Sequence, residues 1–175
     1  MDADVLMRQL KEGDLDRAAD LFVMYNKRLY NFFLKSTYDR DLSHDLTQTV
    51  FYRMIRYRQS FGGNHNFRSW IYQVARNVMS DHFRKEQKVS MFVDIEDIGD
   101  KAESNNIPGE SYRQLYQAMA LLEDEQRELL VMSKFQKMKY EEIAVIMDTT
   151  VGNVKVKVYR AMKQLKKHYN RMEAL

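Results

Sequence analysis

The chain has 175 residues, of which 45% are hydrophobic and 30% charged, and its formal net charge is +3. This composition is typical of a folded globular protein and argues against intrinsic disorder. The absence of cysteine excludes disulfides, thiolate metal sites and thiol redox sensing, and no apolar run approaches the roughly 20 residues that span a bilayer. The first residues also lack the pattern of a signal peptide, so we predict a cytoplasmic protein without direct membrane insertion.

Helices dominate the predicted fold. One proline and six glycines leave little to interrupt them, and few runs alternate as half-buried strands do, so we predict an all-α protein. A helix is expected over residues 3–12, with Gly13 as the left-handed residue after its end. Asp14 is then the expected N-cap of a second helix that runs to about residue 35. Helical spacing predicts its buried face as Ala18, Phe22, Tyr25, Leu29 and Phe33.

Two more helices complete the N-terminal half. The third, from about residue 42 to 57, displays on its sides Asp45, Gln48, Thr49, Tyr52 and Arg53. Residues 62–66 form a glycine- and asparagine-rich loop, and a fourth helix begins after it. Large residues beside an apolar stripe are usually buried, so we predict that Phe67 and Trp70 belong to the core. His82 falls on the same face and is predicted to be a core histidine.

Charge is unevenly distributed along the chain. Basic residues dominate positions 53–88 and the C-terminal helix, and an acidic segment lies between them. Two basic blocks around an acidic spacer suggest two contacts with a polyanion, whereas a solvated helix face is the usual explanation of any single block. Residues 88–111 have weak periodicity and contain the only proline, Pro108, so we predict a linker.

The C-terminal residues predict a helix-turn-helix. Helices are expected over residues 112–122 and 124–135, followed by a short helix at 140–147 and a longer one that Thr150 caps. The last helix has an apolar face of Val154, Val158, Ala161 and Leu165, and its other face is basic. Two helices joined by a few residues, the second apolar inside and basic outside, form the pattern of this DNA-binding motif.

Three short patterns follow one another in a fixed order. They are DLTQTVF at residues 45–51; FRSWI at 67–71 with ARN at 75–77, Asp81 and Arg84; and YEEIA at 140–144 with GNVK at 152–155 and RA at 160–161. Together they resemble the extracytoplasmic-function (ECF) sigma factors, the small promoter-recognition subunits of bacterial RNA polymerase. The resemblance implies two small helical domains: sigma region 2, a helical bundle, over residues 1–87, and sigma region 4 over 112–175. An acidic linker, 88–111, joins them, and region 3 is absent.

The resemblance also implies partners. The family's D-L-x-Q helix docks on the clamp coiled coil of the largest polymerase subunit, which predicts core polymerase contacts at Asp45, Gln48, Thr49 and Tyr52. The alternative for these residues is a salt-bridged surface helix. Further expected partners are the polymerase flap, promoter DNA and an anti-sigma factor. No cofactor or metal is expected.

Promoter contacts are expected in both domains. A surface that melts the −10 element needs cations for phosphates, aromatics for stacking and polar groups for a flipped base. The predicted −10 residues are Asn64, His65, Asn66, Arg68, Arg76 and Arg84, with Arg56, Tyr57 and Phe61 as further candidates. The predicted −35 residues, on the second helix of the motif, are Asn153, Lys155, Val156, Lys157, Tyr159, Arg160 and Lys163.

Some positions depart from the family pattern. Asp148 and Lys137 stand where glycine is common, so the turn at Asp148 is expected to be either slightly strained or differently closed. Val156 stands where a small polar residue is usual, and the base preference at −35 is therefore not predicted.

Two other functions agree less well with the sequence. A stand-alone helix-turn-helix regulator accounts for the C-terminal half but leaves the patterns between residues 45 and 84 without a role. An enzyme is not predicted, because the four histidines lack the spacing of a metal or acid–base site and no nucleotide-binding motif occurs.

Overall fold

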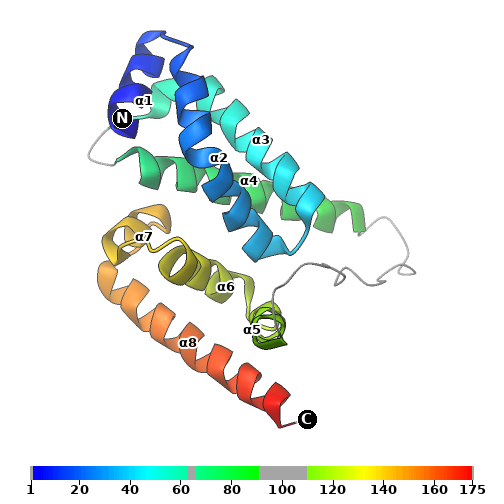
Figure 1. The fold of residues 1–175 in the computed structure, drawn as a ribbon. Helices are drawn as coiled ribbons and strands as arrows, with labels where there is room; N and C mark the ends of the chain where they lie inside the picture. The colour runs from blue at the N-terminus through cyan, green and yellow to red at the C-terminus, as the bar shows by residue number, and fades with distance from the viewer. Residues whose placement is uncertain (1, 63–65, 91–109, 175) are drawn as a thin grey trace. The chain divides into compact units, whose positions relative to one another are not determined.

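A computed structural model describes residues 2–62, 66–90 and 110–174. The predicted site residues Asn64 and His65, and residues 91–109 of the predicted linker, lie outside the described residues. The all-α prediction is confirmed: the described residues form eight α-helices, a 3₁₀-helix and a π-helical turn, and contain no strand (Figure 1). None of the described helices is long and apolar enough to cross a lipid bilayer. The chain divides into two compact units, Met1–Ala102 and Glu103–Leu175.

The N-terminal unit contains four α-helices and the 3₁₀-helix. They are α1 (Ala3–Glu12), α2 (Arg17–Thr37), α3 (Arg40–Arg56), η1 (Arg58–Ser60) and α4 (Phe67–Ser90). Helix α2 packs against α1 and α3, and α3 packs against α4 (Figure 1). The core is rich in aromatic rings: Phe32 meets Tyr72 edge-on at 5.3 Å between centroids, and Tyr25 meets Phe67 at 5.0 Å. Such pairs add stabilisation beyond the burial of their area.

The ends of these helices largely follow the sequence. Helix α1 ends at Gly13 with φ of 112°, as predicted. The Asp14 N-cap is wrong, because α2 begins only after Asp16 and the Asp14 carboxylate instead accepts a hydrogen bond from Arg17 Nε at 2.9 Å. Asp39 caps α3 by accepting from the Leu42 N–H at 2.9 Å. The start of α3 is therefore determined by a local side-chain contact.

Two positions on the predicted buried face of α2 are not buried: Ala18 is half-buried and Phe22 is exposed. Phe22 is 42% exposed, and the neighbouring Leu21 is fully buried in its place. Tyr25, Leu29 and Phe33 are buried as predicted, so the core departs from the predicted stripe by one position only near the start of α2. Phe22 lies at the edge of the buried face, with its ring 4.8 Å from that of Phe51 on α3.

The C-terminal unit consists of α5 (Glu110–Ala120), α6 (Asp124–Leu130), α7 (Tyr140–Ile146) and α8 (Val151–Glu173). A π-helical turn, η2 (Val131–Phe135), extends α6. Helices α5, α6 and α7 all pack against α8, which therefore forms the spine of this unit (Figure 1). The α7–α8 pair is the predicted helix-turn-helix.

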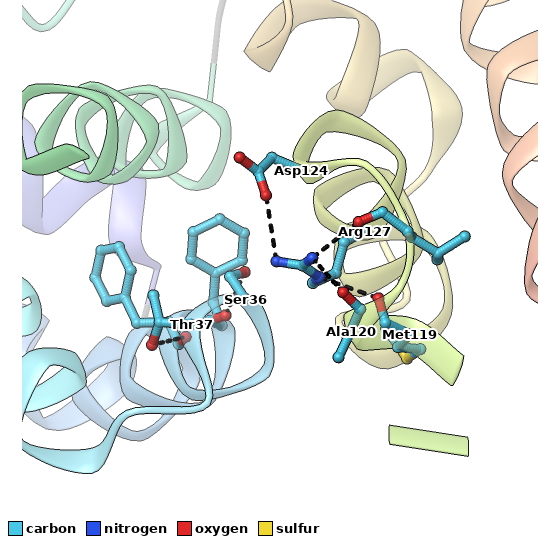
Figure 2. A network of polar contacts seen from close by, with 9 residues as sticks. Ser36, Thr37, Met119, Ala120, Asp124 and Arg127 are labelled. Carbon is cyan, nitrogen blue, oxygen red and sulfur yellow. Dashed lines mark hydrogen bonds and ion pairs between the residues drawn. The ribbon is translucent and has the colours of Figure 1, made fainter. Parts of the chain in front are cut away.

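A single arginine closes the end of α5. Arg127 of α6 donates from Nε to the Met119 carbonyl at 3.1 Å, and from Nη2 to the carbonyls of Ala120 and Leu122 at 3.0 and 2.9 Å (Figure 2). Its Nη1 lies 3.3 Å from Asp124 Oδ1. The last carbonyls of a helix have no partner within it, so this guanidinium supplies donors that α5 lacks.

Figure 2 also shows hydroxyl groups that bond back along α2. Ser36 Oγ donates to the Phe32 carbonyl at 2.8 Å, and Thr37 Oγ1 donates to the Phe33 carbonyl at 2.9 Å. These bonds satisfy hydroxyls near the C-terminal end of the helix. Helix α2 then ends at Tyr38, which has a left-handed backbone with φ of 58°.

The turn of the helix-turn-helix is left-handed at a residue other than glycine, as predicted. Asp148 has φ of 49°, and Lys137, the other position where glycine is common, has φ of 51°. The N–H groups of Asp148 and Thr149 bond to the carbonyls of Val145 and Ala144 at 3.2 and 2.9 Å, which satisfies the end of α7. The turn therefore closes normally, and the cost is the left-handed conformation itself.

Candidate functional site

Helix α3 presents the predicted polymerase-binding residues on one exposed face. Asp45, Gln48 and Tyr52 are exposed and Thr49 is half-buried. These positions recur at steps of three and four, so they form one row, and the opposite row is buried: Leu46, Val50 and Met54. The Thr49 hydroxyl donates to the main-chain carbonyl of Asp45 at 2.8 Å. This hydrogen bond does not involve the side-chain carboxylate of Asp45.

Arg53, on the same helix, has a different environment. Its Nη1 lies 2.8 Å from Asp81 Oδ2 on α4, and both side chains are part-buried. This ion pair joins α3 to α4. Arg53 therefore has a structural role, although the sequence placed it among the displayed residues.

A tyrosine–arginine cluster lies at the C-terminal end of α3. Arg56 Nη1 donates to Tyr52 Oη at 3.0 Å, and its guanidinium lies 5.6 Å from the centroid of the Tyr57 ring. The hydrogen bond to Tyr52 raises the pKa of Arg56 further above its usual value, so the cluster carries a permanent positive charge. Tyr52 and Tyr57 are 60% and 51% exposed. A cation with exposed aromatic faces suits phosphates and unpaired bases.

Phe61 does not belong to that surface, and its prediction as a stacking residue is wrong. It is 6% exposed and packs edge-on against Phe67 at 6.2 Å and Trp70 at 5.6 Å. The core position of Phe67 is confirmed, because it is fully buried, whereas Trp70 is half-buried beside it. Three aromatic rings thus join the two sides of the loop that follows η1.

Asn66 has a structural contact at the start of α4. Its Oδ1 accepts a hydrogen bond from the Ser69 N–H, three residues on, at 2.9 Å. This is the geometry of an N-cap, which occupies the amide oxygen. The Asn66 side chain is exposed.

The predicted arginines of α4 do not share one row. Arg68, Arg76 and Arg84 are spaced by eight residues, and each step of eight turns about 80° around a helix. Arg68 and Arg76 are half-buried with contacts of their own, and Arg84 is exposed, 3.9 Å from Asp81 Oδ1. His82 lies at the edge of the core rather than in it, 29% exposed and 3.4 Å from a Glu86 carboxylate oxygen.

Helix α8 exposes most of the predicted −35 residues opposite its core face. Val154, Val158 and Ala161 are buried. The other side carries the exposed residues Asn153, Lys155, Val156, Tyr159, Arg160 and Lys163. Thr150 caps the helix as predicted, because its Oγ1 accepts from the Asn153 N–H at 3.2 Å. Cations and hydrogen-bonding groups on one convex helix face match the major groove of duplex DNA.

Lys157 is the exception on α8. It lies between the buried and exposed rows, and its Nζ pairs with Glu125 Oε1 of α6. The side chain is half-buried. Lys157 thus contacts its own unit, which periodicity alone does not reveal because Glu125 is 32 residues away.

An apolar hollow of about 460 Å³ lies between α5 and the later turns of α8. It is lined by Tyr112, Leu115, Met162, Leu165, Lys166 and Tyr169. The sequence did not predict it. The one signal in the sequence is that Met162 and Tyr169, two large apolar or aromatic residues, lie beside the buried row of α8.

Two family descriptions match the chain. Sigma-70 region 2 matches residues 21–89, and sigma-70 region 4 matches residues 112–165. The ECF RNA polymerase sigma factor SigM of Bacillus subtilis is 30% identical over 157 residues, which cover 87% of this chain and 94% of SigM. The chain belongs to the ECF sigma factors. SigW of Bacillus subtilis is 26% identical over 175 residues, covering 92% of this chain and 93% of SigW.

Solved structures share this sigma-factor fold. CnrH in complex with the cytosolic domain of CnrY is similar over 97% of this chain and 99% of that chain, with a TM-score of 0.73 and 18% identity. RpoE in complex with the anti-sigma factor NepR, from Bartonella quintana, is similar over 87% of this chain and 96% of that chain, with a TM-score of 0.69 and 22% identity. As an ECF sigma factor, this protein is a transcription initiation factor, and such factors are not enzymes.

Proposed function

We propose that this sigma factor docks on core RNA polymerase through the exposed row of α3 and directs it to promoters with −35 and −10 elements. Region 2 would comprise residues 1–87, the linker 88–111 and region 4 residues 112–175. One observation supports the division of labour most directly: α3 and α8, in different units, each expose a polar row opposite a fully buried one. Neither polar row is required for the packing of its own unit.

The α3 row combines directional polar groups with an exposed aromatic ring. Asp45 and Gln48 offer a carboxylate and an amide, and Tyr52 adds a large amphipathic ring. Such a mixture suits a specific protein interface, in which polar contacts determine register and aromatic rings supply buried area. We assign this face, with Thr49, to the clamp coiled coil of the largest polymerase subunit.

Strand opening is assigned to the loop between η1 and α4 and to the arginines beside it. The Arg56–Tyr57 cluster lies before the loop, and Arg68 and Arg76 follow it on α4. Arg84 extends the positive charge towards the end of that helix. Positive charge attracts the DNA backbone, and exposed rings and loop amides hold unpaired bases better than paired ones. Asn64, His65 and Asn66 are the proposed readers of a flipped base.

Recognition of the −35 element is assigned to α8. Lys155, Arg160 and Lys163 supply cations, and Val156 and Tyr159 supply apolar contacts for thymine methyl groups or sugars. Asn153 lies at the N-terminal end of the helix, where recognition helices commonly contact base edges. Because Lys157 is paired with Glu125, it contributes to DNA binding only when that ion pair opens.

Two partners are proposed from the relatives. RpoE and CnrH were solved with NepR and with the cytosolic domain of CnrY, so an anti-sigma factor is proposed for this chain as well. The polymerase flap is the proposed partner of region 4. A protein that acts with RNA polymerase works where the polymerase is, in the cytoplasm.

In vitro transcription tests the proposal. The purified chain is combined with bacterial core polymerase and a library of promoter fragments, and transcripts are sequenced. Initiation at a shared two-element sequence is expected. A chain that binds duplex DNA alone, but neither binds core polymerase nor directs initiation, would be a stand-alone helix-turn-helix regulator instead.

A further inference from the structure

We propose that α1 holds both ends of the −10 loop in place, with Asp4 and Lys11 as positioning residues for promoter opening. This inference rests on the proposed role of residues 62–66. Gly62 and Asn66 are the described residues at the two ends of this loop, and α1 contacts the elements on both sides, η1 and α4. No pattern in the sequence connects α1, about fifty residues earlier, with this loop.

Lys11 holds the first end of the loop. Its Nζ donates to the Phe61 carbonyl at 2.6 Å, and Gln59 Nε2 donates back to the Lys11 carbonyl at 2.8 Å. The same Nζ lies close to Gly62, because a Cβ added there would be 3.5 Å from it. A cation at the carbonyl that ends η1 is favourable, since that carbonyl has no partner within the helix.

Asp4 holds the second end. Its Oδ1 accepts a hydrogen bond from the Phe67 N–H, the first N–H group of α4. A carboxylate at a helix N-terminus satisfies a donor that lacks a partner and interacts favourably with the helix dipole. The Asn66 side chain accepts a hydrogen bond from the Ser69 N–H, two residues after Phe67. The start of α4 is therefore held by two side chains, Asp4 of α1 and Asn66 of the loop.

The two contacts come from one face of a rigid helix. Asp4 and Lys11 are seven residues apart, which is almost two whole turns. Met7 and Leu10 are fully buried and anchor α1 in the core. A loop that must capture a flipped base gains from ends that are already in place, because less conformational freedom is lost when the base binds.

The test uses holoenzyme reconstituted from the full chain and core polymerase, on a promoter selected by the transcription experiment above. Asp4→Ala and Lys11→Met each remove one contact, whereas Asp4→Asn and Lys11→Arg retain an acceptor and a donor. Opening is followed by permanganate reactivity of −10 thymines, on the duplex promoter and on a promoter with a premelted −10 element. Core affinity is measured in parallel.

We expect Asp4→Ala and Lys11→Met to lower opening of the duplex promoter by roughly tenfold each, the scale of one charge-assisted hydrogen bond. Discrimination against single-base changes at −10 should fall as well. Core affinity and initiation from the premelted promoter should change much less, and the matched variants should retain most opening.

Equal losses on duplex and premelted promoters, or no loss at all, would overturn the positioning role. The positioning role would also be overturned if Asp4→Asn and Lys11→Arg lowered promoter opening as much as Asp4→Ala and Lys11→Met. Asp4→Ala could lower the melting temperature of the protein below the assay temperature. In that case promoter opening by Lys11→Met decides whether the positioning role holds, because this substitution leaves the buried anchors Met7 and Leu10 in place. A wild-type holoenzyme that initiates at no promoter would overturn the proposed function and this inference with it.

Discussion

At the scale of single residues, Arg127 has the largest number of described polar contacts in region 4. Its guanidinium donates to three carbonyls at and just beyond the end of α5, and the side chain is only 14% exposed. A buried cation that lost these acceptors would be costly, and the carbonyls would in turn lose their donor. Neither lysine nor a neutral residue reproduces a planar group with five donors.

Arg127→Met is therefore expected to destabilise region 4 by about 2–3 kcal/mol. Urea unfolding of the full chain, followed by far-UV circular dichroism, measures the change. Asp124→Ala is the matched control: it removes the fourth contact, but Asp124 is 94% exposed, so less than about 1 kcal/mol should be lost. Equal effects of the two substitutions would contradict the capping role of Arg127.

At the scale of elements, α3 and α8 follow the same rule. Each has one row of small or medium apolar residues in the core and one row of polar residues with exposed tyrosine. Because the exposed rows make few contacts within their own unit, substitutions there can separate binding from folding. Such substitutions on surfaces away from caps and ion pairs usually change stability by less than about 0.5 kcal/mol.

For α3, the double substitution Asp45→Ala with Gln48→Ala should weaken binding to core polymerase by roughly tenfold or more, since both directional contacts are lost. Affinity is measured with labelled core enzyme. The circular dichroism spectrum and −35 duplex binding should stay unchanged. The docking assignment fails if core affinity is retained.

For α8, Lys155→Ala with Tyr159→Ala should reduce −35 recognition far more than core binding. These side chains are exposed, and Tyr159 is 68% accessible, so the core of region 4 should remain intact. Competition between −35 and unrelated duplexes measures recognition. A parallel loss of core binding would point to unfolding of region 4.

At the scale of the molecule, the two units have separate cores. Aromatic rings fill the N-terminal unit, whereas aliphatic side chains from α5, α6 and α7 converge on α8 in the C-terminal unit. Trp70 is the only tryptophan in the chain, and it lies in the N-terminal unit. Its fluorescence therefore reports the unfolding of one unit, and circular dichroism reports both.

Phe33→Ala tests this separation, because Phe33 is fully buried and large. We expect a loss of about 3–5 kcal/mol in the transition followed by Trp70 fluorescence. Adding Arg127→Met should leave the Trp70 transition unchanged, because Arg127 lies in the other unit. A Trp70 transition that also shifts with Arg127→Met would show that the two units unfold as one.

The sequence predicted best what depends on neighbouring residues. The bounds of α1, the Thr150 cap and the buried row of α8 all follow from spacing and local hydrogen bonding. The left-handed backbone of Asp148 was likewise predicted from a single position. Such features need no knowledge of what packs against them.

Features that depend on distant residues were not predicted. Phe61 is buried because Phe67 and Trp70 lie against it, and Lys157 pairs with a residue of α6. The π-helical turn after α6 has no signature in the sequence. The contacts of Asp4 and Lys11 join positions 63 and 50 residues apart, and only the tertiary fold brings them together.

The ion pair between Lys157 and Glu125 has a consequence for counterions. Each phosphate that a protein neutralises releases condensed cations, which gives a slope of about −0.9 in log affinity against log salt concentration. Lys157 is already neutralised within region 4 and releases none. The salt dependence of the −35 affinity should therefore correspond to the release of one counterion fewer than the number of cations on α8 suggests. The substitution Glu125→Ala frees Lys157, so it should steepen the slope of log affinity against log salt concentration by about 0.9.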